Sequence, residues 1–284
     1  MKLAVSSFAW QPGDTERVLV VLGGSQVVSG VELVLPMAFA DPATVSHVEV
    51  EQVRARVAAF GLSIPSVQSL VFGKPDLQLF GDTEARGRLL GHLVRMASLA
   101  EDLGARTMVF GSPASRLRRG MALDVANELA VDFFMRLGDL LPGKGPVVTI
   151  EPNPPIYAGC DWLNHTAEAL EFVRRVDHPR VRLQLDTGAM VSAIEAAQPH
   201  DTSLLNEALG SGAHLHISAP GLLPIRSGDS IQQRIARDLL RAGLAESDHL
   251  PWVSIEMKGG PDPISGIQEA VAAVRAWYPI NMDA

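Results

Sequence analysis

The sequence predicts an α/β fold, a (β/α)8 TIM barrel in which residues 1–284 form a single domain. Short, almost continuously apolar segments alternate with amphipathic ones, which is typical of parallel strands covered on both faces by helices. About eight such units fit into the chain, and this is the repeat number of a TIM barrel. An open doubly wound sheet is the alternative, but its glycine-rich G-x-G-x-x-G turn is missing, because the chain reads A-W-Q-P-G-D after the first strand.

Eight short apolar runs account for the strands. In order, they are expected at residues 2–8, 30–36, 62–69, 106–112, 146–152, 181–187, 213–218 and 251–257. Helical patterns lie between them, for example at 48–60 and over the long segment 83–103. The apolar start of the chain is too short to span a membrane, and no A-x-A-like cleavage site follows it. We therefore interpret it as the first strand and not as a signal peptide.

The composition excludes several classes of protein. Hydrophobic residues make up 47% of the chain and charged residues 20%, which excludes a disordered chain. The net charge of −8 argues against a nucleic-acid partner, which usually binds a basic face. The short cluster Arg116, Arg118 and Arg119 is interpreted as a solvated face, with phosphate recognition as the alternative. A single cysteine, Cys160, rules out an internal disulfide, so we expect a cytoplasmic protein with no membrane partner.

Polar residues end the last four expected strands, where a TIM barrel carries its chemistry. They are Glu151, Asp186, His216 and Glu256. Taken singly, each is compatible with a helix cap or a salt bridge; at matching places in consecutive units, they indicate one site. Three carboxylates in one place repel one another, and a divalent cation resolves that repulsion. Oxygen-rich ligation with one imidazole suits Mn²⁺, which we expect, with Mg²⁺, Co²⁺ or Zn²⁺ as alternatives.

The residues two positions earlier on the same strands can all form hydrogen bonds. They are Thr149, Gln184, His214 and Ser254. Each faces the same way as its ligand but lies deeper in the barrel, where Val, Ile or Leu is usual. We interpret them as support that orients the metal ligands, with space filling as the alternative for Thr149 and Ser254. His214 is also a candidate for contact with the substrate.

Further candidates for substrate binding lie near other strand ends. Gln68 ends the third strand and Asn153 lies just beyond the fifth, so both can reach a substrate. Trp10, past the first strand, can form an apolar wall, although a core position is equally typical of tryptophan. The segment 72–81, F-G-K-P-D-L-Q-L-F-G, has the profile of a lid or an oligomer contact. Side chains alternate along the second strand, so Glu32 points either into the barrel or away from it. The sequence does not settle which, and Glu32 is given no role.

Four motifs of this chain, T-I-E-P-N-P, L-Q-L-D-T-G, H-L-H-I-S and V-S-I-E-M-K, resemble those of the xylose isomerase-like TIM barrels. This is the sugar phosphate isomerase/epimerase group, which includes ketose 3-epimerases, hydroxypyruvate isomerase and inosose dehydratase. The stretches V-Q-S-L-V-F-G-K-P-D-L-Q-L-F-G and V-F-G-S-P-A-S-R are similar to that group as well. The resemblance covers essentially the whole chain and is specific for the superfamily, not for the substrate.

The resemblance implies one divalent metal ion, held by Glu151, Asp186, His216 and Glu256. It also implies a polyhydroxylated keto substrate, such as a keto-sugar, whose carbonyl and a neighbouring hydroxyl chelate the ion. In epimerases similar to this chain, one glutamate removes the proton α to the carbonyl and another returns it to the opposite face of the enediolate. By that resemblance Glu151 and Glu256 are the acid/base pair of a metal-dependent sugar isomerase or epimerase. Dimers and tetramers are frequent among similar proteins, which leaves a homo-oligomer open.

The chain departs from the ketose 3-epimerase pattern at four positions. Ala189 stands where those enzymes have a histidine, and Ala219 where relatives often have a glutamate. Leu222 replaces an arginine that contacts the sugar, and Tyr157 replaces a second glutamate. Arg226 is close enough in sequence to substitute for the missing arginine. These differences alter the groups that handle the sugar and leave the four metal ligands in place.

Three alternatives remain beside the isomerase or epimerase. An inosose-dehydratase-like lyase shares the first proton abstraction and then expels a hydroxyl. A DNA repair enzyme like endonuclease IV needs additional metal-binding histidines and a basic face, and the sequence has neither. A non-catalytic binding or partner subunit is compatible with the departures at Ala189 and Ala219, although the four complete ligands argue against it.

Overall fold

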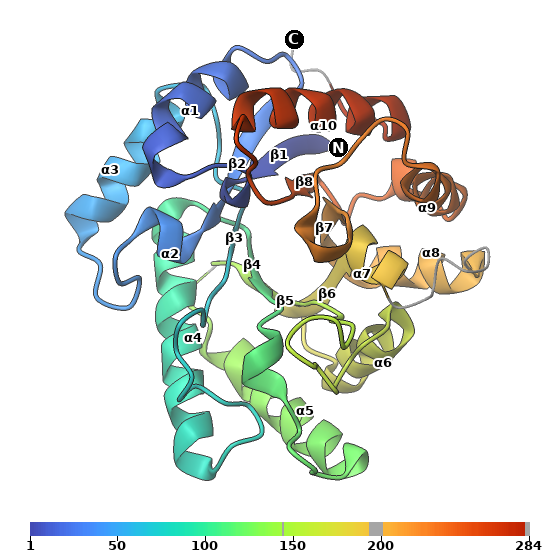
Figure 1. The fold of residues 1–284 in the computed structure, drawn as a ribbon. Coiled ribbons are helices and arrows are strands. Elements are labelled where there is room, and N and C mark those ends of the chain that lie inside the picture. Colours follow the sequence, from blue (N-terminus) through green and yellow to red (C-terminus); the bar gives the residue numbers. More distant parts are fainter. Residues whose placement is uncertain (144, 193–200, 282–284) are drawn as a thin grey trace.

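The chain folds into a closed barrel of eight parallel strands, paired in the order β1 to β8 and surrounded by helices (Figure 1). The computed structural model describes residues 1–143, 145–192 and 201–281. The strands are β1 (Lys2–Ser6), β2 (Val28–Val34), β3 (Ser66–Gln68), β4 (Thr107–Phe110), β5 (Val147–Ile150), β6 (Val181–Asp186), β7 (Gly212–Ser218) and β8 (Trp252–Glu256). The (β/α)8 TIM barrel predicted from the sequence is confirmed.

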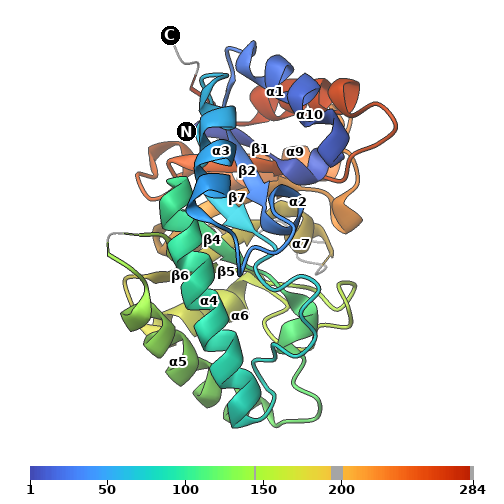
Figure 2. The same ribbon diagram turned by 90° about the vertical axis from the view of Figure 1, so that its left-hand side faces the viewer.

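The helices cover the outside of the barrel (Figures 1 and 2). They are α1 (Thr15–Gly23), α2 (Leu35–Ala38), α3 (His47–Ala58), α4 (Thr83–Leu103), α5 (Leu123–Leu140), α6 (Thr166–Val176), α7 (Thr187–Ser192), α8 (Thr202–Ser211), α9 (Ser230–Arg241) and α10 (Pro263–Trp277). Ser46 and Glu49 form a capping box at the start of α3, and Asp82 caps α4. Within the described ranges, no helix is both long and apolar enough to cross a bilayer.

The register of the last strands aligns their polar positions. Asp186 on β6 lies opposite His216 on β7. Glu256 on β8 lies opposite Ser218, two residues beyond His216 on the same strand. Since all strands are parallel, their carboxyl ends meet at one rim of the barrel, and the polar strand ends meet there too.

Strand β3 is shorter than the run at 62–69 predicts. Pro65 precedes it and has no N–H to donate to a neighbouring strand. The Pro65 carbonyl accepts hydrogen bonds from the backbone N–H groups of Arg106 and Thr107, at 2.8 and 3.3 Å. Regular pairing therefore begins only at Ser66, and the preceding residues contact β2 through an isolated bridge between Gly30 and Ser63.

Candidate metal centre and substrate cavity

The structure brings the four predicted metal ligands together at the carboxyl rim. One donor atom from each of Glu151, Asp186, His216 and Glu256 lies within 4.8 Å of all the others. Nδ1 of His216 is 3.2 Å from Oε1 of Glu151, 3.4 Å from Oε2 of Glu256 and 3.7 Å from Oδ2 of Asp186. The imidazole therefore faces three carboxylate oxygens, and this donor set fits a hard divalent cation.

Asp186 and Glu151 are oriented by hydrogen bonds to the carboxylate oxygen that does not face His216. Oδ1 of Asp186 accepts from the backbone N–H of Ala189 at 2.7 Å and from the Ser218 hydroxyl at 2.8 Å. Oε2 of Glu151 accepts from the Asn153 amide at 3.0 Å. These bonds leave Oδ2 of Asp186 and Oε1 of Glu151 directed toward His216.

Two glycines leave the space that these groups occupy. A Cβ atom at Gly111, just beyond β4, would lie 2.2 Å from Oε2 of Glu151. A Cβ atom at Gly188, in the first turn of α7 directly after β6, would lie 2.3 Å from the Ser218 hydroxyl and 3.1 Å from the backbone of Ala219. The glycines of F-G-S and D-T-G are therefore required by close contact with the site and not by backbone conformation.

Glu32 lies directly beneath the four-residue cluster and is fully buried. Its Oε2 is 3.1 Å from Nε2 of His216, the ring nitrogen that points away from the other carboxylates. Oε2 also accepts from the Ser66 hydroxyl at 2.5 Å, and Oε1 of Glu32 accepts from the Gln68 amide at 2.6 Å. The sequence left the direction of Glu32 open; the structure shows it pointing inward and holding His216.

The deeper polar row faces the interior as expected. Nε2 of His214 is 2.8 Å from the Ser254 hydroxyl and 3.1 Å from Oε2 of Glu32. The Thr149 hydroxyl donates to the Gln184 amide oxygen at 2.9 Å. Donor atoms of Glu32, His214 and His216 are close enough to form a second set that could hold a metal ion.

Burial and charge together set the ionisation of this network. Burial acts to raise the pKa of Glu32, but His216 and His214 hold it well below its ordinary value. Burial acts to lower the pKa of His216, but the charges of Glu32 and Glu256 hold it well above its ordinary value. Burial raises the pKa of Glu256 to about 7, although His216 opposes the rise. For His214, burial outweighs Glu32 and lowers the pKa, so its ring is neutral.

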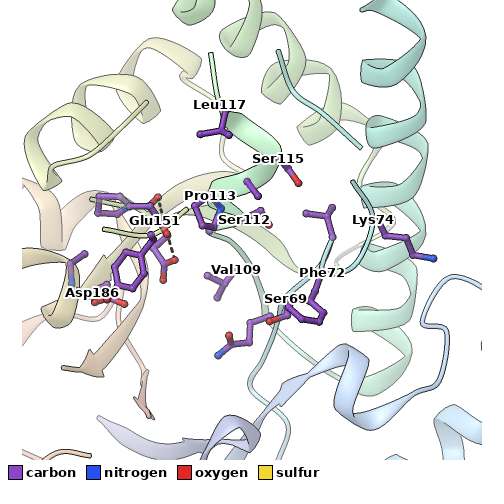
Figure 3. A pocket seen from close by; sticks show the side chains of 18 of the residues that line it. Ser69, Phe72, Lys74, Val109, Ser112, Pro113, Ser115, Leu117, Glu151 and Asp186 are labelled. Atoms are coloured by element: carbon purple, nitrogen blue, oxygen red, sulfur yellow. Dashed lines mark hydrogen bonds between the residues drawn. The ribbon is translucent and has the colours of Figure 1, made fainter. Parts of the chain in front are cut away.

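A cavity of about 660 Å³ opens beside the cluster (Figure 3). Glu151, Asp186 and Glu256 line it at one end, and residues of the β3–α4 and β4–α5 loops line most of the remainder. Gln68 and Asn153, both predicted to contact substrate, are among its lining residues.

Three other residues predicted to contact substrate lie elsewhere in the described structure. Trp10 is 2% exposed within the hydrophobic core, and its indole N–H donates to the Thr15 hydroxyl at 3.2 Å. His214 is buried one layer below the four predicted metal ligands, where it contacts Glu32. Arg226 is exposed on the loop after β7 and is not among the residues that line the cavity. Their placement gives no support to a contact with substrate.

Three of the four positions that depart from the ketose 3-epimerase pattern face the cavity. They are Ala189, Tyr157 and Leu222. The Tyr157 hydroxyl accepts from the backbone N–H of Gly221 at 3.1 Å, which ties the β5–α6 loop to the β7–α9 loop. Burial raises the pKa of Tyr157, so its hydroxyl is protonated.

The predicted basic cluster divides into residues with separate roles. Arg116 is fully buried, and its guanidinium donates to the backbone carbonyl of Glu151 at 2.6 Å. Arg118 donates to Asp161, and Arg119 is exposed at the outer edge of the cavity. A solvated face therefore describes Arg119 but not Arg116, because burial of a cation next to a strand end is invisible in a charge count.

Comparison with known proteins places this geometry in context. A family model described as "Xylose isomerase-like TIM barrel" matches residues 28–277. D-psicose 3-epimerase from Clostridium cellulolyticum H10, solved with D-tagatose, is 14% identical, with 97% of this chain and 98% of that chain covered and a TM-score of 0.73. An E. coli 3-keto-D-glucoside 4-epimerase is 17% identical, with 97% and 99% covered and a TM-score of 0.74. An AP endonuclease, family 2, from Brucella melitensis is 17% identical, with 98% and 100% covered and a TM-score of 0.73. At these identities the solved structures show the same fold.

Proposed function

Because the chain belongs to the family of xylose isomerase-like TIM barrels, we propose that it is a divalent-metal-dependent isomerase or epimerase of a polyhydroxylated keto compound. The observation that carries the proposal is the cluster of three carboxylates and one imidazole beside an open cavity. A structural ion pair network needs no such cavity, whereas convergent polar groups at the carboxyl rim of a TIM barrel are typical of an active site.

Two sets of residues could hold the ion: an outer set of Glu151, Asp186, His216 and Glu256, and an inner set of Glu32, His214 and His216. The outer set suits the ion better. Glu151, Asp186 and Glu256 line the cavity, so an ion among them can be reached by a substrate. Glu32 in the inner set already accepts hydrogen bonds from Ser66 and Gln68, as well as from the histidines. We therefore assign Glu32 to the orientation of His216, as a carboxylate commonly orients a metal-bound histidine.

The acid/base chemistry falls to the two glutamates of the outer set. A divalent ion bound there, with Mn²⁺ first among the candidates, would act as a Lewis acid toward the substrate carbonyl. Glu151 takes the proton from the carbon α to that carbonyl, and the C–H electron pair forms the double bond of an enediolate. Glu256, the second glutamate of the set, returns a proton to the opposite face of the enediolate. The carbonyl then reforms with inverted configuration at that carbon.

Exchange with solvent tests the proposal although the natural substrate is not known. The metal-loaded protein is incubated with a panel of ketoses, ketose phosphates and inososes in deuterium oxide, and the incorporation of deuterium at the α-carbon is followed by NMR. We expect incorporation with at least one compound, and its loss in Glu151→Gln and Glu256→Gln. Glu269→Gln, an exposed glutamate on α10, is the matched control and should exchange normally.

Metal analysis gives the second readout. His216→Ala should lose the stoichiometric ion that the unmodified protein and Glu269→Gln retain. A protein with no stoichiometric divalent ion and no exchange would contradict the proposal and favour a binding or partner subunit. Exchange accompanied by loss of water from the product would replace the epimerase with the lyase.

A further inference from the structure

The outer part of the cavity is built for an apolar group. We propose that the substrate is a polyhydroxylated keto compound that carries an apolar, ring-sized substituent, such as an aryl glycoside of a keto-sugar, and that this substituent packs against the outer wall. The inference rests on the proposed function, because the chelating end of the substrate is placed at the four-residue cluster.

The wall away from the cluster consists mainly of carbon. Its apolar side chains come from the β3–α4 and β4–α5 loops and are Val71, Phe72, Pro75, Pro113, Ala114 and Leu117. Figure 3 shows Glu151 and Asp186 at one end of the cavity and Phe72 at the other. A volume of about 660 Å³ is within the range of cavities that enclose ligands of drug size, so there is room for a ring beyond a chelated sugar.

A large apolar side chain is also exposed at the mouth of this cavity. Phe72 lines the cavity and yet is 74% exposed. Together with the apolar wall behind it, Phe72 forms an accessible hydrophobic surface, which is typical of a binding site.

The long polar side chains of the wall are already engaged with the protein. Gln68 donates to Glu32 and to Ser6, and Gln78 donates to the backbone carbonyl of Pro75. The Lys74 ammonium is 3.2 Å from Asp41. Few groups of the wall are therefore available to bind the distant hydroxyls of a free ketose, apart from the Gln78 amide oxygen, short serine hydroxyls and Arg119 at the outer edge.

A binding measurement tests the subsite independently of catalysis. Phenyl β-D-glucopyranoside and glucose, neither of which carries a ketone, are titrated into the metal-loaded protein by calorimetry. We expect the phenyl compound to bind at least about tenfold more tightly and the advantage to fall about tenfold in Phe72→Ala. Because Phe72 is mostly exposed, its truncation leaves no cavity in the core. Val48→Ala, at an apolar position on α3 that is 63% exposed, is the control and should keep the full advantage.

A kinetic experiment compares the phenyl glycoside of a keto-sugar with the same keto-sugar unsubstituted. We expect a higher kcat/KM for the phenyl glycoside, and we expect the two values of kcat/KM to become nearly equal in Phe72→Ala. Equal binding of the two probes, or an advantage that Phe72→Ala leaves intact, would overturn the subsite. If the phenyl compound binds in a Phe72-dependent manner but no keto compound exchanges its α-proton, the subsite stands and the proposed epimerase fails.

Discussion

Glu32 determines which nitrogen of His216 is available at the cavity side. Its carboxylate lies 3.1 Å from Nε2, and its pKa, which burial would raise, is held well below the ordinary value by the two histidines. A charged acceptor at Nε2 keeps a proton on that nitrogen and leaves the Nδ1 lone pair for a cation. Glu32 is not a member of the outer set, but it therefore prepares His216, which is, to bind the cation through Nδ1.

Replacement of Glu32 by glutamine should weaken metal binding without removing any of the four outer ligands. The amide retains the shape but has a single acceptor oxygen, and it lacks the charge that orients and polarises the imidazole. We expect the affinity for Mn²⁺ to fall by about 10- to 100-fold, as measured by competition with a chromophoric chelator. Glu269→Gln serves as the control. An unchanged affinity in Glu32→Gln would show that His216 does not depend on this carboxylate.

Metal binding should also be coupled to pH. In the protein without its ion, the pKa of Glu256 is raised to about 7 by burial, and that of His216 is held well above its ordinary value. Both groups bind protons that a cation must displace, so the affinity should rise as the pH rises through about 7 and fall below it. Calorimetric titration of Mn²⁺ in buffers of different ionisation enthalpy should detect proton release. An affinity independent of pH from about 6 to about 8 would contradict this coupling.

The sequence brings the four candidate ligands to one rim because each lies at the carboxyl end of a recognisable strand. Glu32 was missed because β2 is buried on both faces, so its apolar pattern does not reveal which residues point inward. Arg116 was grouped with exposed arginines because nothing local distinguishes a cation that donates to a distant backbone carbonyl. Trp10 was placed at the cavity because its distance past the strand end fits either location, and only the packing of α1 decides between them.

At the scale of the element, the turn after β6 holds the site in register. Gly188 donates its backbone N–H to the Ser218 hydroxyl at 3.1 Å, and that hydroxyl donates to Asp186. The turn therefore joins the end of β6 to the end of β7 through one serine. It can do so only because position 188 carries no side chain.

Gly188→Ala should accordingly destabilise the protein and disturb the site together. The added Cβ meets both the Ser218 hydroxyl and the backbone of Ala219, so the turn must shift. We expect the free energy of unfolding to fall by about 1–3 kcal/mol in urea denaturation, with weaker binding of Mn²⁺. Gly87→Ala in α4 is the matched control, because a Cβ there meets nothing within 4 Å. This control should be neutral or stabilise the helix by up to about 1 kcal/mol. Equal stability of the two variants would refute the packing argument.

Strand positions were predictable from apolar periodicity, whereas strand lengths were not. β3 is confined to Ser66–Gln68 although the apolar pattern extends over 62–69. Its length depends on where β2 and β4 can pair with it, and Pro65 removes one donor from that pairing. The length of β3 therefore depends on three strands together and cannot be predicted from the sequence of β3 alone.

At the scale of the whole molecule, the barrel is closed by its two ends. β1 pairs with β8 from Lys2↔Trp252 to Val5↔Ile255, so the first and last strands depend on each other. Glu151 directly follows β5, and Asp186, His216 and Glu256 lie on β6, β7 and β8, so the cluster depends on four consecutive strands of this closed ring. We therefore propose that residues 1–284 unfold as one domain, and that occupancy of the metal centre stabilises the entire barrel.

Removal of the metal should lower the melting temperature of the whole protein. A ligand that binds only the native state stabilises it by mass action. At a free Mn²⁺ concentration of about 100 times Kd the gain is about 2.7 kcal/mol, which for a chain of this size corresponds to about 5–10 °C. Scanning calorimetry of the chelator-treated and Mn²⁺-loaded protein measures this difference. His216→Ala should melt at the same temperature with and without Mn²⁺; a shift as large as that of the unmodified protein would place the stabilising ion at another site.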